Sequence, residues 1–167
     1  MLIDESYFDN PEIAIPSGSY DTRAEFIDRY EPKILEQLFG YELAKEIAAY
    51  TVASDQRIKD IVEGKEFTYG GILLNWVGLQ NNNKVSIIAY YVYYWWQRQN
   101  ISKTNTNTEI KVVSENSVPV TPVQKLSSAW TEYENQQIML FAFMGVNKLD
   151  YPDWRGEPLG NINGFDL

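Results

Sequence analysis

The chain has 167 residues, of which 44% are hydrophobic and 22% are charged, as in an ordinary globular domain with a single core. It contains no Cys and no His, which excludes thiol nucleophiles, histidine general bases, disulfides and the common zinc sites. Its formal net charge of −9 argues against nucleic-acid binding, because a negative surface repels phosphate.

The negative charge is concentrated in the first part of the chain. Residues 1–66 carry 15 acidic and 7 basic side chains, residues 67–120 carry 2 and 4, and residues 121–167 carry 6 and 3. The ordinary interpretation of such an acidic segment is a solvated helical surface. The alternative is an acidic wall past which an anionic polymer slides without binding, and charge alone leaves both open.

We expect neither a membrane segment nor a secretion signal. The longest apolar stretch, Ile87–Trp96, is about half as long as a membrane-spanning helix requires. The opening Met1-Leu-Ile-Asp-Glu lacks the basic and apolar regions of a signal peptide. The sequence therefore predicts a soluble protein that is made and used in a cytoplasm.

The chain is predicted to begin with an arm. Residues 1–20 contain Pro11, Pro16 and Gly18 among polar residues, a composition typical of irregular structure. We therefore expect an N-terminal arm over residues 1–20, outside the helical domain that follows.

Three helical segments are predicted next. A capping box at Thr22-Arg-Ala-Glu25 begins the first helix, which should end at Gly40. Pro32 should kink or restart this helix, because proline lacks an amide proton and clashes with the preceding turn. Apolar residues at helical spacing predict a second helix over residues 41–53, and Ser54-Asp55 should cap a short third one.

A hairpin and an aromatic helix come next. Aromatic and β-branched residues flank Gly70-Gly71, which predicts a β-hairpin near residues 66–78. Asn81-Asn-Asn83 supplies capping side chains for a helix over residues 83–99 that is apolar on almost every face. Such a helix cannot lie at the surface of a small domain, so we expect the subunit to complete its burial against copies or neighbours.

A long polar linker separates the aromatic helix from the last one. Residues 100–120 are rich in Thr and Asn, whereas connections inside compact domains usually have ~4–6 residues. Alternating polar and apolar residues at Glu109–Val113 suggest an edge strand. A second capping box at Thr121-Pro-Val-Gln124 begins a helix that should end at Gly145, and residues 146–167 should form a C-terminal tail.

These elements predict a mainly α fold, a helical bundle with a small β-hairpin and an extended inter-helix arm. The helical domain should span residues 21–145. Its core should contain Ile88, Tyr91, Val92, Trp95 and Trp130. Partner contacts are expected in the arm and the tail, at Ile110, Lys111, Val112, Val113, Tyr151 and Trp154.

Motifs for chemistry are not found in the sequence. Gly70-Gly71 lacks the following Lys-Ser/Thr of a phosphate loop. The stretch Asp150-Tyr-Pro-Asp153 lacks the spacing and the distal Glu of a calcium loop. Glu132 and Glu134 project to different helix faces, which fits surface charge better than an acid–base pair. We therefore expect no catalytic, cofactor-binding or metal-binding residues.

Several short motifs follow one another in a characteristic order. They are Trp96-Gln-Arg98, Ile110-Lys-Val-Val-Ser-Glu-Asn116, Val120-Thr-Pro-Val-Gln-Lys125 and Ala129-Trp130, with Leu35-Glu-Gln-Leu-Phe-Gly-Tyr41 upstream. The pattern resembles the head–tail connector (adaptor or ring) proteins of tailed bacteriophages over about two thirds of the chain. The step from Val-x-Ser-Glu-Asn to Thr-Pro-x-Gln-Lys is its most specific part. The Asn- and Thr-rich linker and the tail depart from the family pattern.

The resemblance implies a structural virion protein and no enzyme activity or cofactor. Such a subunit forms a homo-oligomeric ring matched to the twelve-fold portal, docks beneath the portal protein and contacts a neighbouring tail or ring protein. DNA passes through the channel without specific binding. The implied location is the neck of the virion, after assembly in the host cytoplasm.

A different class of protein stays open on the sequence alone. Tyr90-Tyr91 and Trp95-Trp96 could form a stacking platform in a soluble binding module for a carbohydrate or protein partner. Lectin-like modules are normally rich in strands, whereas this chain is mostly helical, which favours the connector. An enzyme is the least supported class.

Overall fold

The computed structural model describes residues 1–15, 23–103 and 122–157. In these residues the chain is mainly α-helical with one two-stranded antiparallel hairpin, which confirms the predicted fold class. The elements in chain order are the 3-10 helices η1 (Glu5–Asp9) and η2 (Pro11–Ile13), the helices α1 (Arg23–Phe39), α2 (Tyr41–Ala48) and α3 (Gln56–Glu63), the strands β1 (Lys65–Tyr69) and β2 (Ile72–Trp76), and the helices α4 (Ile87–Lys103) and α5 (Pro122–Val146).

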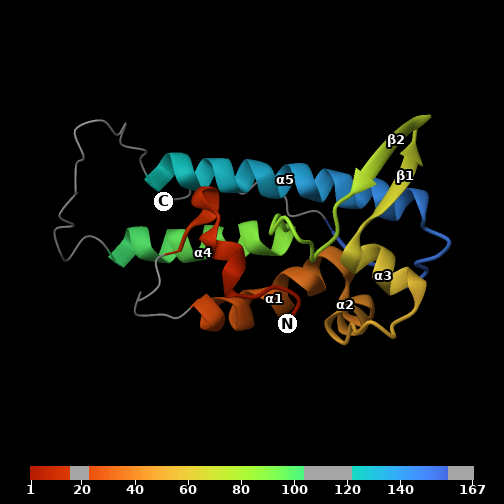
Figure 1. Cartoon of the computed structure of the whole chain (residues 1–167), viewed down its shortest axis with the longest axis horizontal. Helices are drawn as coiled ribbons and strands as arrows, with labels where there is room; N and C mark the ends of the chain where they lie inside the picture. Colours follow the sequence, from red (N-terminus) through yellow and green to blue (C-terminus); the bar gives the residue numbers. More distant parts are fainter. Residues whose placement is uncertain (16–22, 104–121, 158–167) are drawn as a thin grey trace.

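Three long helices form the body of the molecule (Figure 1). α4 lies between α1 and α5 and packs against both. α4 and α5 run antiparallel, and their contact is aromatic: the ring centroids of Tyr94 and Trp130 are 4.7 Å apart, and those of Tyr91 and Tyr133 are 5.8 Å apart. The hairpin, α2 and α3 gather at one end of the body, whereas α4 ends and α5 begins at the other.

The aromatic part of helix α4, residues 87–96, is enclosed within its own chain. α1 covers one side of it, α5 covers another, and η1 and η2 also contact it. The expectation that this helix completes its burial against other subunits is therefore wrong, because a single chain supplies enough cover. The buried residues of α4 are Ile87, Ile88, Ala89, Tyr90, Tyr91, Val92, Tyr93, Tyr94 and Trp96.

Trp95 differs from the other residues predicted for the core. Ile88, Tyr91, Val92 and Trp130 are buried, whereas Trp95 is only partly buried and packs against the edge of the core. Its ring stacks on Tyr30 of α1 with centroids 5.7 Å apart, and the Arg98 guanidinium lies over the Trp95 ring, 5.3 Å from the ring centroid. Trp95 therefore seals the boundary between α1 and α4.

Residues 1–15, the described part of the predicted N-terminal arm, belong to the core and do not form an irregular arm. Asp4 and Asn10 cap η1 and η2, because their side chains accept hydrogen bonds from Ser6 N and Glu12 N. The carboxylate of Glu31 in α1 is buried and accepts hydrogen bonds from the backbone nitrogens of Leu2 and Ile3. Apolar side chains hold the segment against the helices, and those buried are Leu2, Ile3, Tyr7, Phe8, Ile13 and Ile15.

Helix boundaries follow the capping residues with some exceptions. Asp55 caps α3 by accepting from Ile58 N at 3.0 Å, as predicted, and α5 begins at Pro122. Pro32 lies inside α1, which does not restart there. The second helix ends at Ala48, earlier than predicted, and Gly145 is still helical.

Ser86, and not a residue of the Asn triplet, caps the N-terminus of α4. Its hydroxyl accepts from Ile88 N at 3.2 Å and donates to the Leu79 carbonyl at 2.7 Å. Asn81 instead closes the preceding turn, because its side chain bonds both the N–H and the carbonyl of Val85. This turn connects the hairpin to the buried helix α4.

Candidate interaction surface

The β-hairpin is built around the predicted glycine turn. β1 and β2 pair in the register Phe67 with Leu74 and Tyr69 with Ile72. Gly70 and Gly71 form the turn with φ of 58° and 84°. Two consecutive positive φ angles are required by the type I′ turn that matches strand twist, and only glycine adopts them without steric cost.

The base of the hairpin is anchored in the core. The indole of Trp76 is buried, and its Nε1 donates to the Ile61 carbonyl at 2.8 Å. Phe67 is also buried, and its ring meets Phe143 of α5 edge-on with centroids 5.6 Å apart. The hairpin therefore stands in a defined direction from the body.

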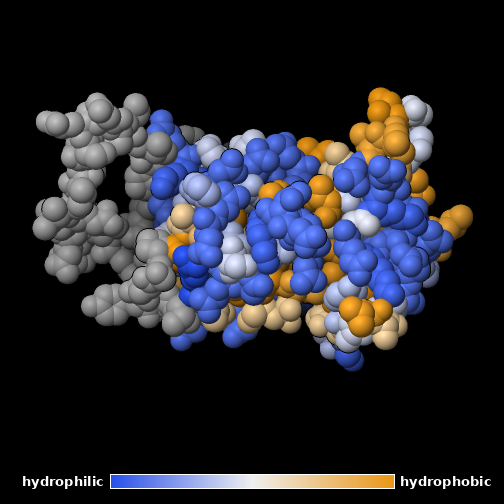
Figure 2. All heavy atoms as spheres, viewed as in Figure 1, coloured by the Kyte–Doolittle hydropathy of each residue, from blue (hydrophilic) through white to orange (hydrophobic). Residues whose placement is uncertain are grey.

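The outer half of the hairpin is apolar and exposed. The exposed fraction is 54% for Tyr69, 65% for Ile72 and 65% for Leu73. A Cβ placed on Gly70 or Gly71 would meet no atom within 4 Å, so the turn lies free of the body. Figure 2 shows the hairpin tip as a hydrophobic projection from a mostly hydrophilic face.

The charged residues of the hairpin, Lys65 and Glu66, lie at its base, and its outer part lacks the features that protect exposed strands. Natural edge strands commonly carry Lys, Pro or inward-pointing charges that prevent pairing with another chain. Residues 67–83 contain no charged residue and no proline. In the part of the chain that the structure describes, the sheet has two strands, so each strand has one edge without a strand partner. An outer hairpin that is uncharged, apolar and exposed is a surface suited to protein contact.

The predicted contact residues fall into two groups: four lie outside the described residues, and Tyr151 and Trp154 contact their own chain. Ile110, Lys111, Val112 and Val113 lie outside the described residues. Tyr151 is buried in its own chain, and its hydroxyl donates to the Arg57 carbonyl at 3.0 Å. Burial raises the pKa of this hydroxyl, so it stays a neutral donor.

Trp154 also contacts its own chain, at the end of α1. Its Nε1 donates to the Leu38 carbonyl at 2.9 Å, while Arg155 N donates to Phe39 O at 3.2 Å and Glu157 N to Gln37 O at 3.0 Å. The last carbonyls of a helix have no partner within the helix, and here the tail supplies three donors for them. The first part of the tail is therefore a cap for α1.

The exposed apolar tip of the hairpin was not predicted from the sequence. The available signal was the consecutive apolar pair Ile72-Leu73, since neighbouring strand residues point to opposite faces and a two-stranded hairpin cannot bury both. The missing charge between Glu66 and Lys84 was a second signal.

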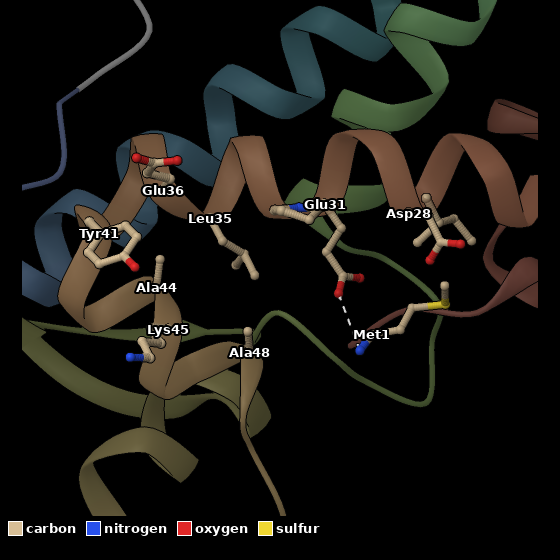
Figure 3. Close-up of a pocket in the computed structure, with 11 residues that line it drawn as sticks. Met1, Asp28, Glu31, Leu35, Glu36, Tyr41, Ala44, Lys45 and Ala48 are labelled. Carbon is tan, nitrogen blue, oxygen red and sulfur yellow. Dashed lines mark ion pairs between the residues drawn. The ribbon is translucent and has the colours of Figure 1, made fainter.

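A shallow groove lies between α1 and α2 (Figure 3). Ile27, Pro32 and Leu35 line it from α1, and Ala44 and Ala48 line it from α2. Tyr41, which is 63% exposed, stands at one end. Glu31 faces the groove but is engaged by the N-terminal segment, and its Oε1 lies 3.7 Å from the Met1 amino group.

Among the described residues no three acidic side chains come together as a metal site would require. The hydroxyl of Tyr133 is buried, which raises its pKa, and it has no hydrogen-bond partner there, but a side chain with no exposed surface is closed to substrate. Tyr90, Tyr91 and Trp96 are also buried, so they do not form an exposed stacking platform.

No helix in the described parts of the chain is both long and apolar enough to cross a membrane. Comparison with known proteins found no matching family model, no matching curated protein and no matching solved structure.

Proposed function

We propose that this protein is a structural virion component, a head–tail connector ring subunit that docks beneath the portal and joins capsid to tail around the DNA channel. The observation that carries the proposal is the hairpin tip, defined by Tyr69, Ile72 and Leu73 on an anchored base. A rigid projection with exposed apolar side chains is suited to insertion between neighbouring proteins.

Two features of the sequence support the same function. The ordered motifs between Ala89 and Phe143 resemble connector proteins, most specifically at Ile110–Asn116 and Val120–Lys125. The net charge of −9 suits a ring through which DNA must pass without adhering, since acidic surfaces repel phosphate. Ring subunits need heterologous contacts that close, and a projection at one end of an elongated body suits that geometry.

The test is binding to the portal protein encoded in the same genome. Full-length chain and portal are mixed and examined by light scattering and by electron microscopy of negatively stained particles. We expect a ring of this chain stacked on the portal. Portal particles that stay bare at every concentration of the chain would reject the connector function.

A matched pair of variants connects the test to the hairpin. Leu73→Asp places a charge at the tip, whereas Ile138→Asp places one at an equally exposed site on α5, since the exposed fractions are 65% and 69%. We expect Leu73→Asp to weaken ring formation at least about tenfold and Ile138→Asp to leave it near the parent level. Equal loss in both variants would show a general charge effect.

A further inference from the structure

The hairpin tip is apolar on both of its faces. Neighbouring residues of a strand point to opposite faces, so Ile72 lies on one face and Leu73 on the other. Tyr69 pairs with Ile72 and shares its face. All three side chains are more than half exposed. A flat partner surface would cover one face and leave the other in water, so burial of the tip requires a site with two apolar walls.

The groove between α1 and α2 has two such walls (Figure 3). Pro32 and Leu35 line it from α1, and Ala44 and Ala48 line it from α2. The groove has a volume of about 290 Å³, whereas an apolar cavity of roughly 150 Å³ is enough to hold a benzene ring. It therefore has room for two branched aliphatic side chains.

The charges of the groove favour an occupant without acidic residues. Its lining includes three carboxylates and one ammonium group, that of Lys45. Asp28 and Glu36 are eight residues apart on α1, which places them about 12 Å from each other along the helix. Two paired strands are only about 4.8 Å apart, so a hairpin fits between these carboxylates. Residues 67–83 are the longest stretch of this acidic chain without a charged residue, so the hairpin meets no repulsion there.

The tip and the groove of one chain face different sides of the body. The hairpin packs against α5, where Phe67 contacts Phe143, and α4 lies between α5 and α1. In Figure 1 the hairpin tip points away from α1 and α2. A second molecule is therefore needed to bring a tip and a groove together.

We propose that the hairpin tip of one copy of this chain inserts into the groove between α1 and α2 of a second copy, with Ile72 against one helix and Leu73 against the other. The insertion also brings Tyr69 to a groove that carries the exposed ring of Tyr41 at one end. The contact joins two different surfaces, so it is head-to-tail and repeats from subunit to subunit. This inference rests on the proposed ring function and names the neighbour contact that would build the ring.

Engineered cysteines test the contact directly, since the chain has no Cys of its own. The double variant Leu73→Cys/Ala48→Cys places one thiol on the tip and one in the groove, both at exposed positions. The control Leu73→Cys/Ala53→Cys moves the second thiol to an exposed alanine in the loop after α2, outside the groove lining. Both full-length variants are oxidised over a series of protein concentrations, with and without the portal.

We expect the groove pair to give a ladder of covalent multimers on denaturing gels and the control pair to give none. A disulfide-closed monomer would show that the tip reaches its own groove and would overturn the proposal, as would equal ladders from both pairs. A chain that gives no ladder while still forming a ring on the portal would overturn this contact alone. A ladder without portal binding would keep the contact and reject the connector function.

A second measurement identifies the occupant without relying on disulfide geometry. The single variant Leu73→Cys is labelled with benzophenone maleimide, mixed with isotope-labelled unmodified chain and portal, and irradiated. We expect adducts on peptides from residues 27–48 of the isotope-labelled chain, identified by mass spectrometry. Adducts on the portal alone, or on other parts of the second chain, would assign the tip to a different site and overturn the proposal.

Discussion

The helix α4 and the hairpin tip differ in how apolar they are and in where those apolar residues lie. α4 is the densest aromatic segment of the chain, yet residues 1–15, α1 and α5 enclose it. The hairpin has fewer apolar residues, but Tyr69, Ile72 and Leu73 remain exposed. Apolar content therefore indicates burial, whereas an interface is indicated by apolar residues that the same chain leaves uncovered.

The largest expected loss of free energy of unfolding follows from a cavity created in α4. Ile88 is fully buried, so Ile88→Ala should lower the free energy of unfolding by about 2–5 kcal/mol, because the core cannot fully collapse around the lost methyl groups. Chemical denaturation of the purified chain measures this. A loss below about 1 kcal/mol would mean that α4 is not enclosed as the structure shows.

The next effect concerns the tail that caps α1. A Cβ on Gly156 would overlap the Leu38 carbonyl oxygen, so Gly156→Ala must push the tail away from the helix. We expect a loss of about 1–3 kcal/mol, as for overpacking elsewhere. Increased hydrogen exchange at Arg155 and Glu157 should accompany it, since their N–H groups donate to Phe39 and Gln37. Unchanged exchange would show that these hydrogen bonds contribute nothing to holding the tail.

The stability of the enclosed helix α4 should depend on pH through the buried hydroxyl of Tyr90. Burial and the nearby charge of Glu12 raise the pKa of Tyr90 in α4 from 10.0 to about 12. The unfolded chain therefore loses this proton first, so the stabilisation is fully present below pH 10 and is lost as pH rises through about 12. Denaturation midpoints should fall over this range, and less so in Tyr90→Phe. Parallel pH profiles for the two proteins would show that Tyr90 does not contribute to the fall.

The smallest effect is expected at the tip. Leu73→Ala should change the free energy of unfolding by no more than about 0.5 kcal/mol, because the side chain is 65% exposed and leaves no cavity. Comparing the free energies of unfolding of Leu73→Ala and Ile88→Ala distinguishes an exposed contact residue from a core residue. A loss as large as that of Ile88→Ala would place Leu73 in the core and remove the basis for the proposed contact.

Much of the secondary structure could be predicted because its signals are local. Asp55 accepts from an amide three residues away, Pro122 occupies a position where no amide proton is needed, and Gly70-Gly71 adopts positive φ that other residues avoid. Each of these depends on the residue and its immediate neighbours, so it is readable before the chain folds.

Only the tertiary structure decided which surfaces remain free. Part of the cover of α4 comes from η1 and η2, whose buried side chains include Tyr7, Phe8 and Ile13 and which lie in a segment predicted to be an irregular arm. Tyr151 was expected to contact a partner but is bound to Arg57 of its own chain. Burial is a property of elements brought together from distant parts of the sequence, so composition determined that apolar residues must be covered, and long-range packing determined which ones the chain covers itself.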